Sequence, residues 1–334
     1  MTSPTVRDVA ALADVSLATV DRVLNNRKGV SAKAIAKVRA AVAQSGYIRN
    51  LAAANLSQRR VYRFCFVVPA GDTGFIALLQ NAIEAQRSHL MQRQILIQIV
   101  PTRAFDVAGQ VAVLRSLDCD AVALMVSESP EIQEEVSRLM AAGIQVVTLV
   151  ADLPQSGRSA YVGIDNVAAG RTAAEFMGRF VHGAGPVLMI AGSLTSRDHT
   201  ERLMGFRLVM QERFETLGLL PVVEGSDDAA TVERLVLAAA AARPLAGIYA
   251  IGAGNRGLVR AVNAITPKPV TIVHELTPTS RAGLRDGTIT LVLDQDTLAA
   301  TAAAVEIMRQ LTEGRDLPPD AGKIRLNLYC RENI

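Results

Sequence analysis

From residue 62 onward, short runs rich in valine, isoleucine and leucine alternate with longer stretches of helical periodicity. The expected strands are 62–69, 94–101, 120–126, 144–150, 186–192, 219–225, 247–252, 269–275 and 288–293, with a last crossing strand in 325–333. The expected helices between or after them are 75–92, 106–117, 131–142, 199–217, 230–242, 254–265, 278–286 and 295–313. This alternation predicts parallel sheets covered by helices on both faces. Because about 270 residues exceed one compact core, we expect two α/β lobes.

Residues 5–24 follow a different pattern, with two short helical periods separated by a break at Asp14. The second period follows Ser16, whose hydroxyl is a suitable N-cap because it can accept from a backbone N–H in the first turn. Two short helices joined by a tight turn form the helix-turn-helix unit, whose second helix enters the major groove of DNA. An ordinary helical hairpin has the same pattern, so the pattern alone leaves both interpretations open.

The distribution of charge favours DNA. Residues 1–60 contain ten basic and three acidic side chains, a net charge of +7, whereas the remaining 274 residues contain 25 basic and 29 acidic ones. The overall charge of +3 hides this division. A basic segment joined to a slightly acidic region predicts a polyanionic partner for the basic segment alone.

The N-terminal sequence also resembles a known DNA-binding head. TVRDVAALADVSLATVDRVLNN and the following VSAKAIAKVRAAVAQSGYIRNLAAANL are similar to the head of the LacI/GalR family of transcriptional regulators, and YVGIDNVAAGRTAAEFMGRFV and HTERLMGFR resemble parts of its core. The resemblance implies an all-α helix-turn-helix domain at 1–49, a hinge helix and linker at 50–61, and an effector-binding core at 62–334 that is similar to periplasmic sugar-binding proteins. We expect one lobe of about 62–160 plus the C-terminal crossing segment, and a second lobe of about 161–325.

The resemblance assigns DNA-binding roles position by position. Side chains at the start of the recognition helix would face base edges, and others would hold phosphates, which positions the head without reading sequence. The expected DNA-binding residues are Thr5, Ser16, Leu17, Ala18, Thr19, Arg22, Asn25, Asn50, Ala53 and Leu56. Leu56 in the hinge helix would wedge a base step in the minor groove, and a plain packing leucine is the alternative.

Candidate effector-binding residues follow from a rule that needs no family. Ligands of doubly wound sheets bind outside the carboxyl ends of the strands. That rule selects Asp72, Phe75, Arg103, Asp152, Arg202, Asn255, His274, Glu275 and Gln295. Such groups suit a sugar, because hydroxyls need directional partners and a C–H face stacks on an aromatic ring. Each residue could instead cap or solvate a loop, although the family comparison also places Arg202, Glu275 and Gln295 at effector-contact positions.

The family mechanism that the resemblance implies is a coupling between two sites. A homodimer would bind double-stranded operator DNA, and a sugar, polyol or sugar phosphate between the lobes would change operator affinity. We therefore expect a repressor of carbohydrate or polyol uptake and catabolism genes, not an enzyme, with no cofactor and no metal site. The N-terminus resembles no signal peptide and the chain has no run of eighteen apolar residues, so we expect a cytoplasmic protein without a membrane partner.

Two other functions fit single features. Residues 252–257 read GAGNRG, and Glu275 lies eighteen residues further on, as in a dinucleotide-binding fingerprint of an NAD(P)-dependent oxidoreductase. The motif lies deep in the chain, however, whereas this fingerprint normally opens the first βαβ unit, and the basic head would be unexplained. A periplasmic transport receptor would fit the core alone, but it leaves the basic head unexplained as well.

Overall fold

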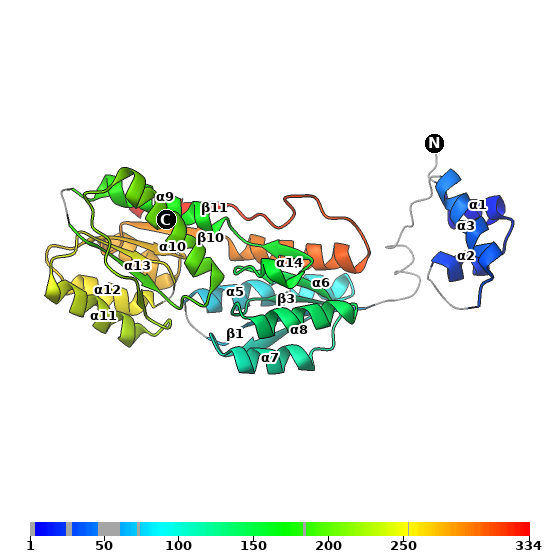
Figure 1. Cartoon of the computed structure of the whole chain (residues 1–334), viewed down its shortest axis with the longest axis horizontal. Coiled ribbons are helices and arrows are strands. Elements are labelled where there is room, and N and C mark those ends of the chain that lie inside the picture. The colour runs from blue at the N-terminus through cyan, green and yellow to red at the C-terminus, as the bar shows by residue number, and fades with distance from the viewer. Residues whose placement is uncertain (1–3, 25–28, 46–60, 72–73, 183–184, 253) are drawn as a thin grey trace. The chain divides into compact units, whose positions relative to one another are not determined.

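The computed structural model describes residues 4–24, 29–45, 61–71, 74–182, 185–252 and 254–334. The chain forms two compact units, Met1–Arg60 and Val61–Ile334, called the head and the core below. The head contains helices α1 (Val6–Ala13), α2 (Leu17–Leu24) and α3 (Ala32–Ser45). Figure 1 shows these units with the labels used here.

Local capping sets the boundaries of the first two helices. Thr5 caps α1 through a reciprocal pair of hydrogen bonds with Asp8, and the expected cap Ser16 accepts from the backbone N–H of Thr19 at 3.1 Å. Between the two helices, Asp14 adopts a left-handed conformation, which Asp tolerates better than most residues, and ends α1. The three helices pack around a small buried core of Val9, Ala10, Ala13, Val20, Val38 and Ala41.

The first lobe of the core contains a five-stranded parallel sheet in the order β2-β1-β3-β4-β5. Its strands are β1 (Tyr62–Pro69), β2 (Ile95–Thr102), β3 (Ala121–Leu124), β4 (Gln145–Leu149) and β5 (Ala160–Val162). Its helices are α5 (Gly74–Glu84), α6 (Arg87–Gln92), α7 (Val107–Ser116), α8 (Pro130–Ala141) and α14 (Thr297–Thr312). Successive side chains of β1 point to opposite faces, so Phe64 and Phe66 join the cluster with α5 and α14, whereas Cys65 and Val67 join the cluster with α7 and α8.

The second lobe contains a six-stranded sheet in the order β11-β10-β9-β8-β6-β7. Its strands are β6 (Val187–Ala191), β7 (Val223–Glu224), β8 (Gly247–Ala250), β9 (Val270–His274), β10 (Leu291–Gln295) and β11 (Leu326–Tyr329). Its helices are α9 (Asn166–Phe180), α10 (Arg197–Arg213), α11 (Ala229–Ala242), α12 (Asn255–Asn263) and α13 (Pro278–Asp286). Side chains of α9 and α10 join one buried cluster and those of α11, α12 and α13 join another, so helices cover both faces of this sheet as well.

The structure differs from the sequence-based expectation at the lobe boundaries. β11 pairs antiparallel with β10 in the second sheet, so the crossing segment does not join the first lobe and this sheet is not purely parallel. Helix α14 packs against α5, β3 and β4 of the first lobe, although we expected it in the second. The three-residue strand β5 was not expected, and only Val223–Glu224 of the predicted strand 219–225 forms a named strand.

The chain passes between the two lobes three times, after β5, after β10 and after α14. Two of these crossing segments are hydrogen-bonded to each other. The backbone N–H of Gly163 donates to the carbonyl of Gly322 at 3.0 Å, and that of Ile324 donates to the carbonyl of Gly163 at 2.9 Å. The crossings therefore form a short paired connection that links the lobes.

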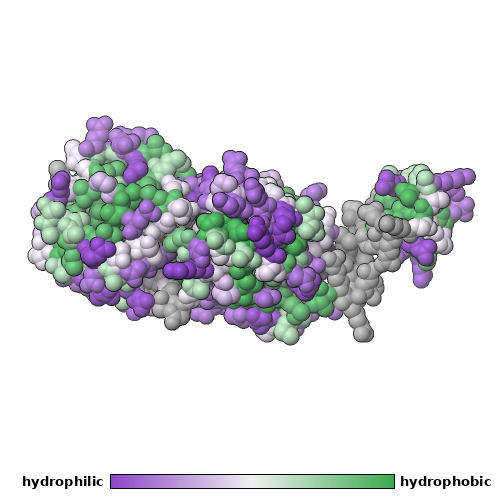
Figure 2. All heavy atoms as spheres, turned by 60° about the horizontal axis from the view of Figure 1, so that its bottom comes forward, coloured by the Kyte–Doolittle hydropathy of each residue, from purple (hydrophilic) through white to green (hydrophobic). Residues whose placement is uncertain are grey.

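The face of the core seen in Figure 2 mixes hydrophobic and hydrophilic residues. Among the described residues, we find no helix with the length and apolar character needed to cross a membrane.

Candidate functional site

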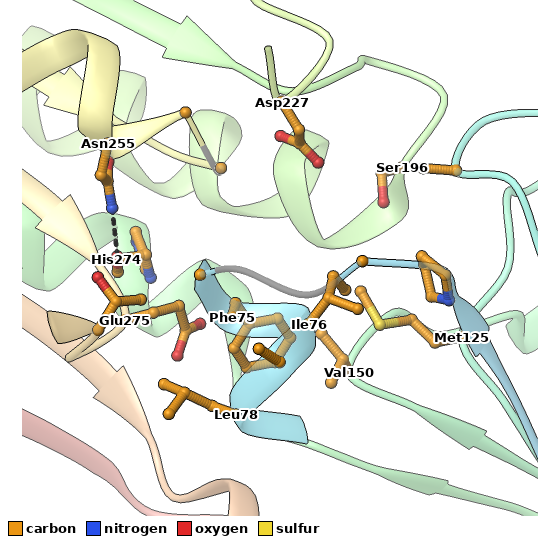
Figure 3. A pocket seen from close by; sticks show the side chains of 18 of the residues that line it. Phe75, Ile76, Leu78, Met125, Val150, Ser196, Asp227, Asn255, His274 and Glu275 are labelled. Atoms are coloured by element: carbon orange, nitrogen blue, oxygen red, sulfur yellow. Dashed lines mark hydrogen bonds between the residues drawn. The ribbon is translucent and has the colours of Figure 1, made fainter. Parts of the chain in front are cut away.

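A cavity of about 710 Å³ lies between the two lobes of the core (Figure 3). Residues that follow β1, β3 and β4 line it from the first lobe, and residues at the ends of β8, β9 and β10 line it from the second. The carboxyl ends of both sets of parallel strands therefore face the same space, which is where such sheets bind ligands. The volume lies within the range of small-molecule sites.

The two walls of the cavity differ in chemistry. The first lobe contributes mainly apolar side chains, which are Phe75, Ile76, Leu78, Met125, Val126 and Val150. The second lobe contributes mainly polar ones, which are Ser196, Asp198, His199, Arg202, Asp227, Asn255, His274, Glu275 and Gln295. A ligand that fills the cavity would therefore contact an apolar surface on one side and hydrogen-bonding groups on the other.

Six buried polar atoms of this cavity have no hydrogen-bond partner among the described residues. They are Ser127 Oγ, Arg202 Nη2, Asn255 Oδ1, His274 Nδ1, Glu275 Oε2 and Gln295 Oε1. A buried polar atom without a partner costs about 1–3 kcal/mol, so native proteins leave few of them. Their concentration in one cavity indicates a site that a polar ligand completes.

Burial controls the protonation of two groups in the polar wall. Burial raises the pKa of Glu275 to about 8, against the opposing effect of Arg202. It lowers the pKa of His274 well below the ordinary value, and Arg202 adds to this shift. His274 Nε2 lies 2.8 Å from the hydroxyl of Tyr249, whose ring stacks on Phe206 with centroids 4.5 Å apart. At neutral pH the wall therefore presents a protonated carboxyl group and an uncharged imidazole.

Arg202 is held mainly by the protein itself. Its Nε donates to Asn166 Oδ1 at 2.8 Å and its Nη1 donates to the carbonyl of Ile251 at 3.0 Å. Nη2 lies 3.9 Å from Asp198 Oδ2, beyond hydrogen-bond distance. Although burial opposes the shift, His199, Arg202 and Ser196 hold the pKa of Asp198 below its ordinary value. The guanidinium therefore has one nitrogen available to a ligand.

Backbone strain is concentrated at the cavity. Seven described residues other than glycine have positive φ, and Phe105, Val150, Asp227 and Glu275 among them line the cavity. Val150 is the most unusual case, because a β-branched residue is a genuine outlier in that region. Such strain typically occurs at functional sites, where the surrounding structure holds it in place.

The two lobes also contact each other beside the cavity. Glu128 of the first lobe pairs with Arg197 of α10, with Oε1 and Nη1 3.3 Å apart. The backbone N–H of Glu128 donates to the carbonyl of Thr195 at 3.2 Å. Because Ser127 and Ser196 are lining residues, these contacts hold the lobes together at the edge of the cavity.

The structure brings most of the expected effector-binding residues together. Those that line the cavity are Phe75, Arg202, Asn255, His274, Glu275 and Gln295. Arg103 and Asp152 are not among the lining residues, and Asp72 lies outside the described residues.

Other contacts or positions in the structure explain why Asp152 and Arg103 do not line the cavity. Asp152 pairs with Arg158, whose Nη2 lies 2.6 Å from Oδ2, and it also accepts from the hydroxyl of Thr148 at 2.8 Å. Burial alone would raise the pKa of Asp152, but Arg158 and Thr148 together hold it below its ordinary value. Arg103 is exposed after the edge strand β2, and the next two residues, 104–105, reach the cavity instead.

Several lining residues were missed by the sequence-based analysis, namely Gln110, Ser127, Asp198, His199 and Asp227. Ser127 directly follows the predicted strand 120–126, and Asp227 lies two residues after the predicted strand 219–225, so the rule on strand ends would have selected both. Gln110 lies within α7, where its Oε1 accepts from the backbone N–H of Ser127 at 3.0 Å. No local pattern distinguishes it.

The glycines of GAGNRG have packing roles. A Cβ atom on Gly252 would lie 2.8 Å from His199 Nε2, and one on Gly257 would lie 1.7 Å from the carbonyl oxygen of Ala229. Gly254 has a φ of +95° and precedes α12, a conformation that favours glycine. The spacing of these glycines therefore needs no dinucleotide to explain it.

In the head, α2 exposes its first residues. Leu17 is 47% exposed, Ala18 and Arg22 are also exposed, and Val20 turns inward to the small core. The hydroxyls of Ser16 and Thr19 lie 2.9 Å apart. Hydrogen bonds at the helix N-termini therefore engage the side chains of Thr5, Ser16 and Thr19. The outer face of α2 is exposed to solvent. Asn25, Asn50, Ala53 and Leu56 lie outside the described residues.

Comparisons with known proteins match both units. The family described as "Bacterial regulatory proteins, lacI family" matches residues 5–50, and the family described as "Periplasmic binding protein domain" matches residues 64–316.

Individual proteins are similar to parts of the chain. The HTH-type transcriptional regulator DegA of Bacillus subtilis is 28% identical over 209 residues, 62% of this chain and 61% of DegA. The maltose regulon regulatory protein MalI of Vibrio furnissii is 52% identical over 52 residues, 16% of this chain and 38% of that protein. The chain thus spans less than two thirds of the lengths of these curated relatives.

Among solved structures, an ABC transporter solute-binding protein of Burkholderia graminis in complex with D-arabinose has a TM-score of 0.74. It is 23% identical, and the match covers 82% of this chain and 96% of that protein. At this identity the similarity concerns the fold.

Proposed function

Because the chain belongs to the lacI family of bacterial regulatory proteins, we propose that it is a transcriptional regulator whose head binds operator DNA and whose core binds a small effector. The observation that carries this proposal is the open face of α2 in a basic head, combined with a separate core whose cavity holds unpartnered polar atoms. Binding of one ligand at each site is what a two-site regulator requires.

The proposed DNA contacts divide into two kinds. Leu17, Ala18 and Arg22 face base edges from α2, and the hydroxyls of Thr5, Ser16 and Thr19 contact phosphates while they cap the helices. Among the described residues, exposed basic side chains of the head include Arg7, Arg22, Lys33, Lys37 and Arg39, which supply the sequence-independent attraction. We keep Asn25, Asn50, Ala53 and the Leu56 wedge as proposed contacts.

The proposed effector is a sugar or a related small molecule, and the proposed targets are genes of carbohydrate or polyol uptake and catabolism. The name of MalI, a maltose regulon regulatory protein, and the D-arabinose complex of the solute-binding protein support this direction. We further propose that the protein acts as a cytoplasmic homodimer and that it has no enzymatic activity. Coupling of effector binding to operator binding requires two conformations of the protein that differ in operator affinity. The effector shifts the balance between them only if it binds one conformation more tightly than the other.

Selection of binding sites from a randomised DNA pool tests the proposal. We expect enrichment of a pseudo-palindromic sequence, with a preference that changes by about 1–3 kcal/mol per affected base pair when Leu17 is replaced by Gln. Leu12→Gln is the matched control, because Leu12 is 48% exposed but lies on α1. A pool that shows no enrichment would contradict the proposed function, and equal effects of the two variants would contradict the role of Leu17.

A further inference from the structure

The unpartnered atoms of the cavity have a defined hydrogen-bonding character. Asn255 Nδ2 donates to the carbonyl of His274 at 3.1 Å, and Gln295 Nε2 donates to Glu275 Oε1 at 2.7 Å. These bonds orient both amides, so Asn255 Oδ1 and Gln295 Oε1 remain as acceptors. A ligand must therefore bring hydrogen-bond donors to both places.

Three of the other unpartnered groups can either donate or accept. They are the Ser127 hydroxyl, the His274 imidazole, and the Glu275 carboxyl group, which is protonated at neutral pH. Only Arg202 Nη2 is restricted to donating among the six atoms. Hydroxyl groups both donate and accept, so a ligand with several hydroxyls can satisfy the whole set. Phosphate oxygens accept only, and they cannot satisfy the two amide oxygens.

The charges around the cavity oppose an anionic ligand. Its lining includes the carboxylates of Asp198, Asp227 and Asp228 against two arginines, while the Glu275 carboxyl group is uncharged at neutral pH. Arg202 has two of its three nitrogens bonded within the protein. Helix N-termini attract anions. Four helices of the second lobe begin at lining residues: α11 and α13 already donate from their first turns to Asp228 and Thr277, whereas α10 and α12 have no side-chain cap. A phosphate group would therefore face three aspartate carboxylates in this cavity, and Arg202 could offer it only one nitrogen.

The opposite wall is suited to the apolar face of a ring. Phe75, Ile76 and Leu78 of α5 lie together with Met125 and Val150 on the side of the first lobe (Figure 3). The C–H face of a sugar ring packs well on an aromatic ring and on such aliphatic groups. Because the two walls differ in this way, the apolar face of a ligand would lie against the first lobe and its hydroxyl groups would point to the second lobe.

From these observations we infer that the cavity binds a neutral polyhydroxyl compound without a phosphate group, with its hydroxyls toward the second lobe and an apolar face toward Phe75. This inference rests on the proposed function for the assignment of the cavity as the effector site, and it narrows the class of effector. We expect the phosphate monoester of the true ligand to bind at least about a hundredfold more weakly, because like charges that face each other without water are strongly unfavourable.

Calorimetric titration of the full chain with matched pairs of compounds tests the inference. Each pair is a pentose, hexose, hexitol or disaccharide and its phosphate monoester, and thermal shifts select the pairs to be titrated. We expect at least one free compound to bind and its ester to bind at least about a hundredfold more weakly. An ester that binds as tightly as the free compound overturns the inference, and so does a panel in which no free compound binds.

Two variants test the origin of the discrimination. Asp227→Asn removes one carboxylate from the cavity and should reduce the ratio of the two affinities, free compound over ester, by about tenfold. Asp152→Asn is the control, because Asp152 is not a lining residue of the cavity. This variant should leave the affinity ratio unchanged. Circular dichroism melting checks that both variants fold. If either variant fails to fold, the titration of the wild-type protein with ester and free compound still tests the inference. An equal effect of the two substitutions would contradict the charge argument.

Operator binding is measured separately on the same preparation. A protein that binds a free polyhydroxyl compound but no DNA would refute the proposed function and leave this inference standing. A protein that binds DNA but prefers phosphate esters would refute the inference and leave the regulator proposal intact.

Discussion

Replacing Glu275 by Gln should stabilise the ligand-free protein at neutral pH. The Glu275 side chain is buried, its Oε1 accepts from Gln295, and its Oε2 has no partner among the described residues. Glutamine has nearly the same shape and keeps an acceptor for Gln295, but it is uncharged in the unfolded state as well and needs no proton in order to be buried. The substitution therefore removes the cost of taking up a proton on folding, while it leaves the packing nearly unchanged.

The magnitude follows from the raised pKa of Glu275. The carboxyl pKa is about 8 in the folded protein against an ordinary value of 4.5. Below pH 4.5 both the folded and the unfolded state hold the proton. As pH rises, the unfolded state loses the proton first, so the free energy of unfolding falls by about 1.4 kcal/mol per pH unit until the folded group also ionises near pH 8. At neutral pH the accumulated loss is about 3 kcal/mol, and water in the cavity would reduce it.

Urea unfolding of wild type and Glu275→Gln from about pH 5 to about pH 8 measures this effect. Circular dichroism is a suitable probe because the chain contains no tryptophan. The control is Glu134→Gln, an exposed position on α8, which should change the free energy of unfolding by less than about 0.5 kcal/mol at each pH. If the difference between wild type and Glu275→Gln stays constant across the range, Glu275 is not a buried acid that stays protonated, and the reasoning fails.

Three further predictions concern packing, the buried arginine and DNA. Gly257→Ala should destabilise the core by about 1–3 kcal/mol in urea melts, because its Cβ would collide with the Ala229 carbonyl, whereas Gly218→Ala, which meets nothing within 4 Å, should be nearly neutral; equal effects would contradict the packing explanation. Arg202→Ala should cost about 3–5 kcal/mol of unfolding free energy by leaving Asp198 without its buried cation, and an unchanged melt would show that the guanidinium serves ligand binding alone. Operator affinity should fall about a thousandfold or more between 50 and 200 mM salt in a fluorescence titration, and a flat response would contradict phosphate binding by the basic head.

Local patterns in the sequence determined most of the elements. β1 spans the predicted residues 62–69, and α13 spans the predicted residues 278–286. Periodicity was sufficient there because both faces of β1 are buried, and because Thr277 and Gly287 mark the ends of α13. The position of the cavity was equally accessible, since the carboxyl ends of parallel strands share one edge of a sheet. That rule placed Phe75, Asn255 and Glu275 correctly among the lining residues.

Only the tertiary structure decided which lobe receives each crossing segment and which polar groups remain available. Helix α14 and strand β11 carry no local mark of the lobe they join, because apolar faces of similar composition fit either one. The strand-end rule selected both Asp152 and Arg202. In the structure, however, the carboxylate of Asp152 is bonded to Arg158, and two of the three nitrogens of Arg202 donate to Asn166 and to the carbonyl of Ile251. Ion pairs and buried hydrogen bonds depend on partners distant in the chain, so the sequence alone determined where polar residues gather and the fold determined which of them a ligand can reach.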